Sequence, residues 1–372
     1  MKITRKVVFL FAMAMMPFTQ ALAQTVTDLM GRQVVIPATP HRVMLADARA
    51  IEAMSIVFHG DPSANIAAWD DSLKKKSPDI MRTFAANFPA LKTIPTFANP
   101  YTTTFDVENA VARHTDLVIF DIGLVTKLRD EGVMDKLDSL HIPYIFIDLR
   151  QKPLQNTATS MALLGQVFDQ QKNAQQFLDF YQQRLDLIKQ RVATLNTQQR
   201  PTVFIERSAG IVGDFCCSTF GQGSMGEFTE AAGGINLGGQ LFKGMGGDVT
   251  LEKIITLNPD YYLLTGADWQ GNPKASASVP LGYQLPEAPA KQKLAALMSR
   301  TGFNVLQATQ KHHVMAIYHQ FYDLPSNVVA VEAIAKFLHP QLFKDLDPQA
   351  DMDRIHQSFM GLKTSGTFWI TE

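Results

Sequence analysis

Residues 105–121 read FDVENAVARHTDLVIFD, and residues 249–265 read VTLEKIITLNPDYYLLT. In both stretches a glutamate comes eight residues before an aspartate, and the two stretches lie 144 residues apart. These pairs are Glu108 with Asp116 and Glu252 with Asp260. Each stretch has the pattern of a short helix, then an aspartate, then an apolar strand. We therefore expect the two halves of the chain to share one supersecondary unit.

Strand patterns alternate with helical patterns on both sides of these stretches, which favours βαβ units and buried parallel sheets. A hairpin is expected over residues 26–37, with its turn at Met30-Gly31. Further strands are expected at 42–45, 116–120, 144–148, 202–206, 261–264 and 314–318. Helices are expected at 48–58, 127–140, 225–232, 251–257 and 328–337, and one more from Asp351. The Pro/Gly/Ser-rich stretch 269–290 is expected to be a loop.

One purely helical stretch, 154–195, separates the two halves. Asp169 is expected to end a first helix and to cap a second, which covers roughly residues 172–195. At 1.5 Å per residue this second helix is about 36 Å long. The expected organisation is a leader at 1–23, an N-terminal lobe at 24–153, linking helices at 154–197 and a C-terminal lobe at 198–372.

The first residues have the pattern of a signal peptide. Lys2, Arg5 and Lys6 precede the apolar run 7–16, and Ala21-Leu22-Ala23 is a small-x-small cleavage site. We expect a mature chain from Gln24, exported to the periplasm and without a lipid anchor, since no Cys follows the cleavage site. The alternative is a buried N-terminal helix.

The remaining composition limits the function classes. The chain has 34 Lys and Arg against 35 Asp and Glu, and loss of the leader leaves a net charge of about −4. Nucleic-acid binders usually carry a basic excess, so that class is disfavoured. The two cysteines, Cys216 and Cys217, are adjacent, and either a vicinal disulfide or two packed thiols is compatible with the sequence.

The sequence resembles class III periplasmic binding proteins, which serve ABC importers for ferric siderophores, haem and cobalamin. The resemblance lies in VTDLMGRQVVIPATPHRVM at 26–44, the two Glu-to-Asp stretches, AAGGIN at 231–236 and the long central helix. It implies an α/β fold of two Rossmann-like lobes with parallel sheets, joined by one long rigid helix, with ligand held in the cleft between the lobes. It also implies a monomer that meets an ABC permease dimer in the inner membrane.

Glu108 and Glu252 match the glutamates with which this family contacts permease arginines. The simpler interpretation is helix capping, because a carboxylate in the first turn of a helix is stabilised by the helix dipole. The two interpretations are compatible.

Candidate ligand contacts follow from the rule that ligands of open α/β sheets lie outside the carboxyl ends of the strands. Cationic candidates would bind the oxygens of an anionic chelate, and aromatic candidates would stack on its rings. They are Arg49, Tyr101, Arg150, Arg207, Lys243, Trp269, His319, Phe321 and Tyr322, with the segment Phe215–Phe220 nearby. For each residue alone, a solvated, paired or core position is the competing interpretation.

Other functions remain open. His319, Tyr318 and Tyr322 are possible axial ligands of a haem iron. No spacing of histidines indicates a bare-metal site, and no resident cofactor is expected. A secreted redox enzyme that uses Cys216-Cys217 is the alternative from another class, but the pair lacks C-x-x-C spacing and no hydrolase or phosphate-binding motif occurs. An adhesion module would not explain the matched glutamates. We therefore expect a binding protein for an iron-type chelate.

Overall fold

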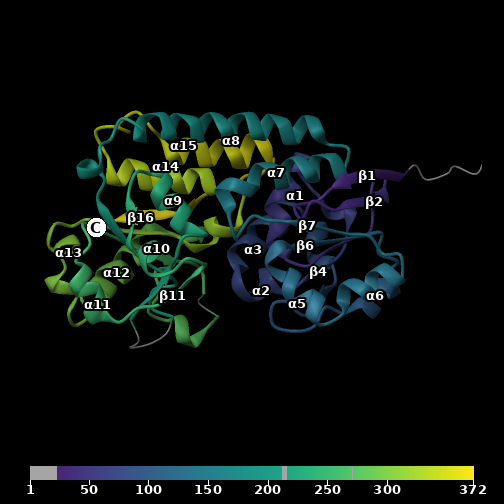
Figure 1. Ribbon diagram of the computed structural model, residues 1–372, viewed down its shortest axis with the longest axis horizontal. Coiled ribbons are helices and arrows are strands. Elements are labelled where there is room, and N and C mark those ends of the chain that lie inside the picture. The colour runs from purple at the N-terminus through teal and green to yellow at the C-terminus, as the bar shows by residue number, and fades with distance from the viewer. Residues whose placement is uncertain (1–22, 212–215, 270) are drawn as a thin grey trace, which may run out of the picture.

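The structure is a computed structural model that describes residues 23–211, 216–269 and 271–372. The predicted leader over residues 1–22 and the candidate residue Phe215 lie outside these ranges. Two sheets stand side by side, one from each half of the chain, and the long helix α8 runs along one side of both (Figure 1). This arrangement confirms the predicted α/β class with two lobes.

The N-terminal half forms a five-stranded parallel sheet in the order β5-β4-β3-β6-β7. A hairpin precedes it, as predicted, with Gly31 at φ 76° in the turn. The strands are β1 (Ala23–Thr27), β2 (Gln33–Pro37), β3 (Val43–Leu45), β4 (Ile66–Asp70), β5 (Thr96–Phe97), β6 (Leu117–Asp121) and β7 (Tyr144–Ile147). The helices are α1 (Ile51–Phe58), α2 (Ser72–Lys76), α3 (Pro78–Asn87), α4 (Val107–Ala112), α5 (Val125–Asp130) and α6 (Val133–Ser139).

The linking helices are α7 (Pro153–Val167) and α8 (Gln171–Val192). The predicted break at residue 169 is confirmed, with Asp169 at φ 54°, but the cap is not, because the residue before α8 is Gln170 and no side chain caps the helix. Close packing of the two helices depends on Gly165, where an added Cβ would lie 2.6 Å from the Cβ of Ala174.

The C-terminal half forms a larger sheet in the order β11-β9-β8-β12-β14-β16, with β10 beside β8. Its strands are β8 (Thr202–Glu206), β9 (Ser218–Phe220), β10 (Ile235–Asn236), β11 (Gly246–Asp248), β12 (Tyr261–Gly266), β14 (Val314–Tyr318) and β16 (Trp369–Thr371), and β13 (Gly282–Tyr283) pairs separately with β15 (Gly366–Thr367). Its helices are α9 (Met225–Ala231), α10 (Leu237–Leu241), α11 (Leu251–Leu257), α12 (Glu287–Met298), α13 (Gln307–Gln310), α14 (Asn327–Leu338) and α15 (Pro348–Arg354). None of the described helices is long and apolar enough to cross a membrane.

The two matched stretches have the same local structure. Asp116 accepts hydrogen bonds from the backbone N–H groups of His41 and Arg42, just before β3. Asp260 accepts hydrogen bonds from the backbone N–H and the hydroxyl of Thr202, the first residue of β8. In each half the aspartate before one strand therefore fixes the start of the neighbouring parallel strand.

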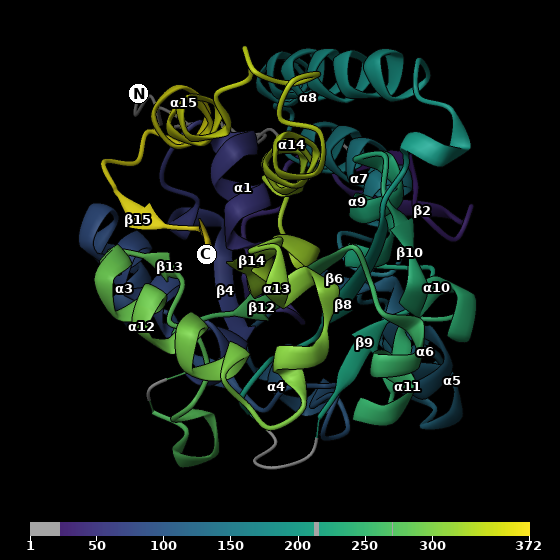
Figure 2. The ribbon, with the colours of Figure 1, turned by 90° about the vertical axis from the view of Figure 1, so that its left-hand side faces the viewer.

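The ends of the two matched helices are also equivalent. His114 and Asn258, again 144 residues apart, adopt left-handed conformations at φ 50° and φ 42°. α4 and α11 lie on the same side of the molecule, opposite α8 (Figure 2). The predicted internal repeat is therefore present in the backbone.

Two predictions of secondary structure were wrong. Residues 127–140 do not form one helix, because Gly132 at φ 68° separates α5 from α6. Residues 269–290 are not all loop, since β13 and the first turn of α12 lie within them. The helices and strands in these two stretches are short, and their boundaries depend on tertiary contacts rather than on hydrophobic periodicity.

The two halves are joined by more than α8. Asp79 of α3 accepts a hydrogen bond from Tyr318 Oη at 2.6 Å, and Glu52 of α1 accepts one from Tyr283 Oη at 3.1 Å. Glu52 also accepts a hydrogen bond from the backbone N–H of Ser326. All five residues are buried, so these contacts hold the lobes together inside the protein.

Candidate functional site

Polar and aromatic side chains from both lobes meet where the parallel strands end. In the N-terminal half, Arg49 follows β3 in the short helix η1 (Ala48–Ala50), Asp121 ends β6 and Arg150 follows β7. In the C-terminal half, the short helix η8 (His319–Asp323) follows β14. We call the following residues the interlobe cluster: Arg49, Tyr101, Asp121, Arg150, Arg207, Phe220, Trp269, His319, Tyr322 and Asp323.

Arg49 interacts with other side chains of the protein. Its Nη2 lies 2.6 Å from Asp47 and 2.7 Å from Asp323, and its Nη1 donates a hydrogen bond to Tyr322 Oη at 2.8 Å. Only 1 % of its surface is exposed. Burial alone would raise the pKa of Asp47, but the charge and hydrogen bonds of Arg49 together with the charge of Arg150 hold it below its ordinary value. Burial raises the pKa of Asp323 to about 8 despite the nearby Arg49. Arg49 therefore links the two lobes.

Arg150 is the contrasting cation of the cluster. Its guanidinium lies 4.6 Å from the ring of Tyr101 and 5.3 Å from the ring of Tyr322. Its Nε and Nη1 are buried and have no hydrogen-bond partner among the described residues. Buried donors of a cation are costly to leave unpaired, so an orphaned guanidinium between two aromatic rings is suited to an anionic ligand.

Tyr101 does not offer a free hydroxyl to a ligand, because it donates its hydrogen bond to Asp121. Burial raises the pKa of Asp121 to about 6, although the hydrogen bond from Tyr101 and the charge of Arg150 act in the other direction. The ring of Tyr101 therefore serves as one wall beside Arg150.

His319 lies at the centre of the aromatic side of the cluster. Its ring centroid is 4.9 Å from that of Tyr322, 5.1 Å from that of Trp269 and 6.1 Å from that of Phe220. Its Nδ1 shares a hydrogen bond with Thr265 Oγ1 at 2.9 Å. Burial lowers the pKa of His319 to about 3, and Arg207, Arg49 and Arg150 lower it further in that order. The imidazole is therefore neutral at ordinary pH.

Arg207 completes the cluster from the C-terminal lobe. Its guanidinium lies 5.9 Å from the ring of Phe220, and its backbone N–H donates to Ser218 O at 2.7 Å. The cluster thus combines three arginines and a neutral histidine with four other aromatic rings. Such a surface can bind an anion that carries flat rings or apolar groups.

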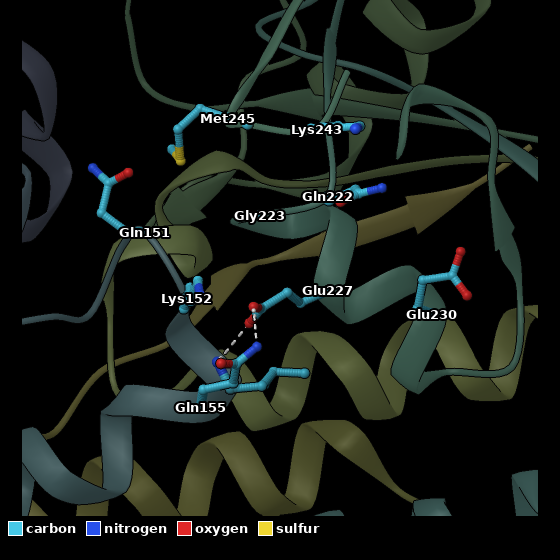
Figure 3. Close-up of a pocket in the computed structure, with 11 residues that line it drawn as sticks. Gln151, Lys152, Gln155, Gln222, Gly223, Glu227, Glu230, Lys243 and Met245 are labelled. Atoms are coloured by element: carbon cyan, nitrogen blue, oxygen red, sulfur yellow. Dashed lines mark hydrogen bonds between the residues drawn. The ribbon is translucent and has the colours of Figure 1, made fainter. Parts of the chain in front are cut away.

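Two predicted contacts lie elsewhere. Phe321 is fully buried, with its ring packed edge-on against Tyr318 in the core of the C-terminal lobe. Lys243 is exposed and lines a separate pocket of about 590 Å³ (Figure 3). No residue of the interlobe cluster lines that pocket. Phe321 follows β14, but its side chain lies in the core rather than in the interlobe cluster. A position at the end of a strand does not by itself reveal the direction of the side chain.

The pocket of Figure 3 lies at the junction between α7 and the C-terminal lobe. Glu227 of α9 accepts hydrogen bonds from Leu154 N and Gln155 Nε2, both at 3.1 Å. Ser224 N donates to Gln151 O at 3.1 Å. These contacts fix the first turn of α7 against α9, so the pocket belongs to the connection between the lobes.

Asp323 was missed by sequence reasoning. It follows the predicted Tyr322 directly, but its sequence neighbours are apolar or proline, and nothing in them indicates a partner in the other half. Asp70 was also missed, because β4 was not predicted. Burial raises the pKa of Asp70 to about 7, and its carboxylate accepts hydrogen bonds from Ala48 N and Ser72 Oγ.

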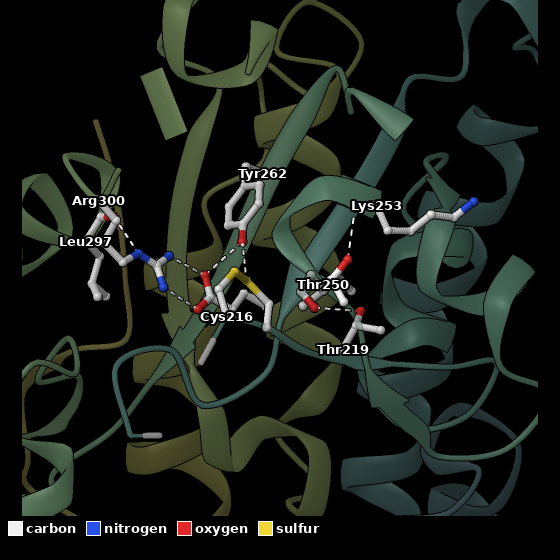
Figure 4. Close-up of a disulfide and its surroundings, with 10 residues drawn as sticks. Cys216, Thr219, Thr250, Lys253, Tyr262, Leu297 and Arg300 are labelled. Atoms are coloured by element: carbon white, nitrogen blue, oxygen red, sulfur yellow. Dashed lines mark hydrogen bonds and ion pairs between the residues drawn. A yellow bond between two sulfur atoms is a disulfide. The ribbon is translucent and has the colours of Figure 1, made fainter. Parts of the chain in front are cut away.

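Cys216 and Cys217 are joined as a vicinal disulfide (Figure 4), which settles the two alternatives that the sequence left open. Tyr262 Oη lies 3.5 Å from the Sγ of Cys217 and donates to Glu206 at 2.8 Å. Arg300 donates two hydrogen bonds to the same carboxylate, at 2.7 and 2.6 Å. The disulfide therefore packs beside a partly buried ion pair.

Comparison with known proteins identifies the family. A family described as periplasmic binding protein matches residues 98–320, which is more than half of the chain. The chain belongs to this family. A search of curated proteins finds no match.

Solved structures of this family have the same fold. The TroA-like periplasmic binding protein FepB from Veillonella parvula is 25% identical, with a TM-score of 0.85 over 93% of this chain and 99% of that one. MolA of Haemophilus influenzae, solved with molybdate, is 16% identical with a TM-score of 0.67 over 92% and 100%. A protein of an Fe3+-hydroxamate transport system from Saccharomonospora viridis is 17% identical, with a TM-score of 0.56 over 85% and 99%.

The family makes this chain a substrate-binding protein of an ABC transporter, which carries a small molecule in the periplasm. MolA was solved with molybdate, whereas the Saccharomonospora viridis protein belongs to an Fe3+-hydroxamate transport system, so the ligands of these similar proteins differ. The comparisons therefore establish that the protein is a substrate-binding protein but do not identify its ligand.

Proposed function

We propose that this periplasmic binding protein captures a ferric siderophore or a similar anionic iron chelate and delivers it to an ABC importer. The observation that carries the proposal is the half-buried side chain of Arg150, whose buried Nε and Nη1 have no partner among residues 23–211, 216–269 and 271–372. A carboxylate, hydroxamate or catecholate oxygen would supply the missing acceptors.

The aromatic residues support a chelate with flat or apolar parts. Tyr101 and Tyr322 flank Arg150, and Trp269 packs edge-on against His319 at 5.1 Å. Arg207 adds a second cation, whose guanidinium lies 5.9 Å from the ring of Phe220. Large rings supply much burial per side chain at little entropic cost, which suits a site that binds one compact ligand.

Delivery rests on the two matched glutamates. Both lie in the first turn of a short helix, and the side chain of Glu108 is 82 % exposed. α4 and α11 lie on one side of the molecule (Figure 2). A permease dimer presents the same surface twice, so one basic group of each subunit would meet one glutamate.

The N-terminal pattern supports export as a cleaved, non-lipidated chain. Lys2, Arg5 and Lys6 followed by the apolar run 7–16 are the residues on which this part rests.

A second candidate ligand is haem or, within the same importer class, cobalamin. The haem alternative is favoured by one observation: His319 is unprotonated, because burial lowers its pKa to about 3, and a neutral imidazole is the form that coordinates iron. The redox-enzyme alternative has less support, since the disulfide lies beside Glu206 rather than among the residues of the interlobe cluster.

The test is a melting-temperature screen of the purified mature chain with a ferric hydroxamate, a ferric catecholate, ferric citrate, haem, cobalamin and molybdate. A ligand at one hundred times its dissociation constant stabilises the folded state by about 2.7 kcal/mol, which is readily measured. We expect one ferric chelate to raise the melting temperature and to lose that effect in Arg150→Met. A shift with molybdate alone would reject the iron assignment.

A further inference from the structure

The vicinal disulfide and the carboxylate beside it form a compact group of side chains that can ligate a metal ion. A carboxylate oxygen of Glu206 and the sulfurs of Cys216 and Cys217 all lie within 4.8 Å of one another. Figure 4 shows the disulfide with the side chains of Arg300 and Tyr262 next to it. The group belongs to the C-terminal lobe and shares no residue with the interlobe cluster, so ligand capture does not account for it.

A structural role explains this disulfide poorly. A cross-link stabilises a protein mainly by closing a loop in the unfolded chain, and the gain decreases with the length of that loop. Cys216 and Cys217 are consecutive, so their bond encloses no other residue. The backbone is also held without the bond, since Cys217 and Val249 exchange two N–H···O hydrogen bonds of 2.7 Å. The position of Cys217 therefore does not depend on the disulfide.

Glu206 is held in place from two sides and still has acceptor capacity. Arg300 donates to its Oε1 at 2.7 Å and to its Oε2 at 2.6 Å, and Tyr262 Oη donates to Oε2 at 2.8 Å. A carboxylate offers about four acceptor positions, so these three donors from the described residues leave one position on Oε1. Only 3 % of Glu206 is exposed. A buried carboxylate oxygen is thus fixed beside the two sulfurs with one lone pair free.

The charges of this group balance in two states. While the sulfurs are bonded, the carboxylate of Glu206 is matched by the guanidinium of Arg300, which lies 2.6 Å away. Two thiolates in place of the disulfide would add two negative charges next to a buried carboxylate, and such charges are costly unless a cation accompanies them. One divalent cation would restore the balance. The reduced pair is therefore suited to a divalent cation.

We propose that Cys216, Cys217 and Glu206 form a binding site for one thiophilic divalent cation of the zinc type, and that the disulfide closes this site. Thiolate sulfur favours such cations over Mg²⁺ and Ca²⁺, and zinc also accepts a carboxylate oxygen. In a tetrahedral site with zinc–sulfur bonds of about 2.3 Å, the two sulfurs lie about 3.8 Å apart. That separation is within the 4.8 Å spread of the group. Cys216 is partly exposed, so water supplies the fourth ligand.

A thiol reductant opens the site. A dithiol breaks the S–S bond between Cys216 and Cys217, the two cysteines take up its two protons and two electrons, and the dithiol becomes a disulfide. One Zn²⁺ then displaces both protons to solvent and bonds to the two thiolates and to Glu206. A small disulfide reverses these steps: it takes up two electrons and two protons to become two thiols, the Cys216–Cys217 bond forms again, and the cation is released.

The test is anaerobic equilibrium dialysis of the purified mature chain with Cd²⁺ and with Zn²⁺. The chain is used oxidised and after reduction by a phosphine, which is oxidised to its oxide and then removed. Cadmium is the spectroscopic probe, because its bonds to thiolates absorb in the ultraviolet. We expect the reduced chain to bind one more cation than the oxidised chain, with the cadmium–thiolate absorption, and a small disulfide to release it. Equal binding by the two forms would overturn the inference.

Substitution tests each ligand. Cys216→Ser and Cys217→Ser should each weaken binding by the reduced chain by about tenfold or more, and Glu206→Gln should do the same because it removes a charged ligand. Glu227→Gln is the matched control, since Glu227 is another partly buried glutamate of the C-terminal lobe, and it should bind as the wild type does. Equal affinities of Glu206→Gln and the wild type would reject the three-ligand site.

Two features of this design keep its result separate from other effects. The comparison of oxidised and reduced wild type needs no substitution, so it decides the role of the sulfurs even where a variant does not fold. Capture of an iron chelate is measured on the oxidised chain and depends on Arg150, which is not part of this group. Failure of the cation site would therefore leave the proposed function untouched, and loss of chelate binding would leave the cation site untouched.

Discussion

The guanidinium of Arg49 lies 2.7 Å from the carboxyl group of Asp323, so a buried polar contact joins the N-terminal lobe to the C-terminal lobe. The contact lacks the alignment of a hydrogen bond, whereas Arg49 binds Asp47 with two aligned donors. Arg49 is therefore mainly a structural cation, and Arg150, two strands away in the sheet, has two donors without a partner among the described residues. This difference between two neighbouring arginines leads to two opposite predictions.

Arg150→Met should weaken binding of the chelate identified in the melting screen by about tenfold or more, because charge-assisted hydrogen bonds are lost. The stability of the ligand-free protein should stay equal or increase, since the substitution removes buried donors that have no partner. Calorimetric titration and thermal unfolding measure the two effects. A destabilised variant that binds normally would contradict both expectations.

Arg49→Met should have the opposite profile. It leaves Asp47 and Asp323 buried without a counter-ion, and breaking such a pair typically costs about 3–5 kcal/mol of folding free energy. Denaturant unfolding of the ligand-free protein provides the measurement. Stability within 1 kcal/mol of the wild type would show that the two carboxyl groups tolerate the loss by taking up protons.

Asp79 predicts a pH dependence of stability between the lobes. Burial raises its pKa to about 6 in the folded protein, from an ordinary value of 3.8. A carboxyl whose folded pKa is raised stabilises fully below pH 3.8, and that contribution is lost as the pH rises through 6. Asp79→Asn keeps an acceptor for Tyr318 and removes the titration. Relative to the wild type, the variant should therefore gain on the order of 3 kcal/mol between pH 4 and pH 7.

The measurement is urea unfolding of both proteins at the two pH values. A constant difference between the variant and the wild type would mean that Asp79 does not titrate in this interval.

The contribution of His319 to folding stability changes with pH in the opposite direction. Its folded pKa is lowered to about 3 from 6.5, so its contribution to stability is present above pH 6.5 and is lost as the pH falls towards 3. We expect the imidazole to remain neutral from pH 5 to pH 8 when observed by NMR. The free energy of unfolding of His319→Phe should fall less steeply than that of the wild type as the pH is lowered. A titration of the ring near pH 6.5 would contradict the burial of His319.

The matched aspartates predict matched stability losses. Asp116→Ala and Asp260→Ala each remove an acceptor of two hydrogen bonds that fixes the start of a strand, and each should cost about 1–3 kcal/mol. Each variant is measured by denaturant unfolding against the corresponding Asp→Asn, which keeps one acceptor oxygen and should cost less. A large loss in only one half would indicate that the two units differ in function despite their shared backbone.

Much of the fold was predictable because it depends on local patterns. The two Glu-to-Asp stretches, the central pair of helices and the strands that follow each have periodicities that are independent of distant contacts. The stretch 60–98 was left unassigned, since β4 and β5 are short and α2 and α3 pack on both lobes. The boundary at Gly132 was missed because nothing in a helical pattern marks a break except one glycine.

From the sequence, the candidate site could be predicted only as a set of residues that lie at the ends of strands. Arg49 and Arg150 were equivalent in the sequence, yet one is saturated by carboxylates and the other is orphaned. Lys243 and Phe321 also follow or precede strands, but the first faces a separate pocket and the second faces the core. The direction of a side chain at the end of a strand depends on a single backbone turn, and the amino-acid composition does not determine that turn.

The sequence by itself determined the repeat, the positions of the two glutamates and the segments that form the sheets, because these follow from spacing and hydrophobic period along one chain. Only the tertiary structure decided that Asp323 lies beside Arg49, that two donors of Arg150 have no partner among the described residues, and that Val111 and Ile255 face solvent in matched positions. Electrostatic pairing and exposure depend on which distant side chains come within a few ångströms of one another, and that is set by the packing of the two lobes.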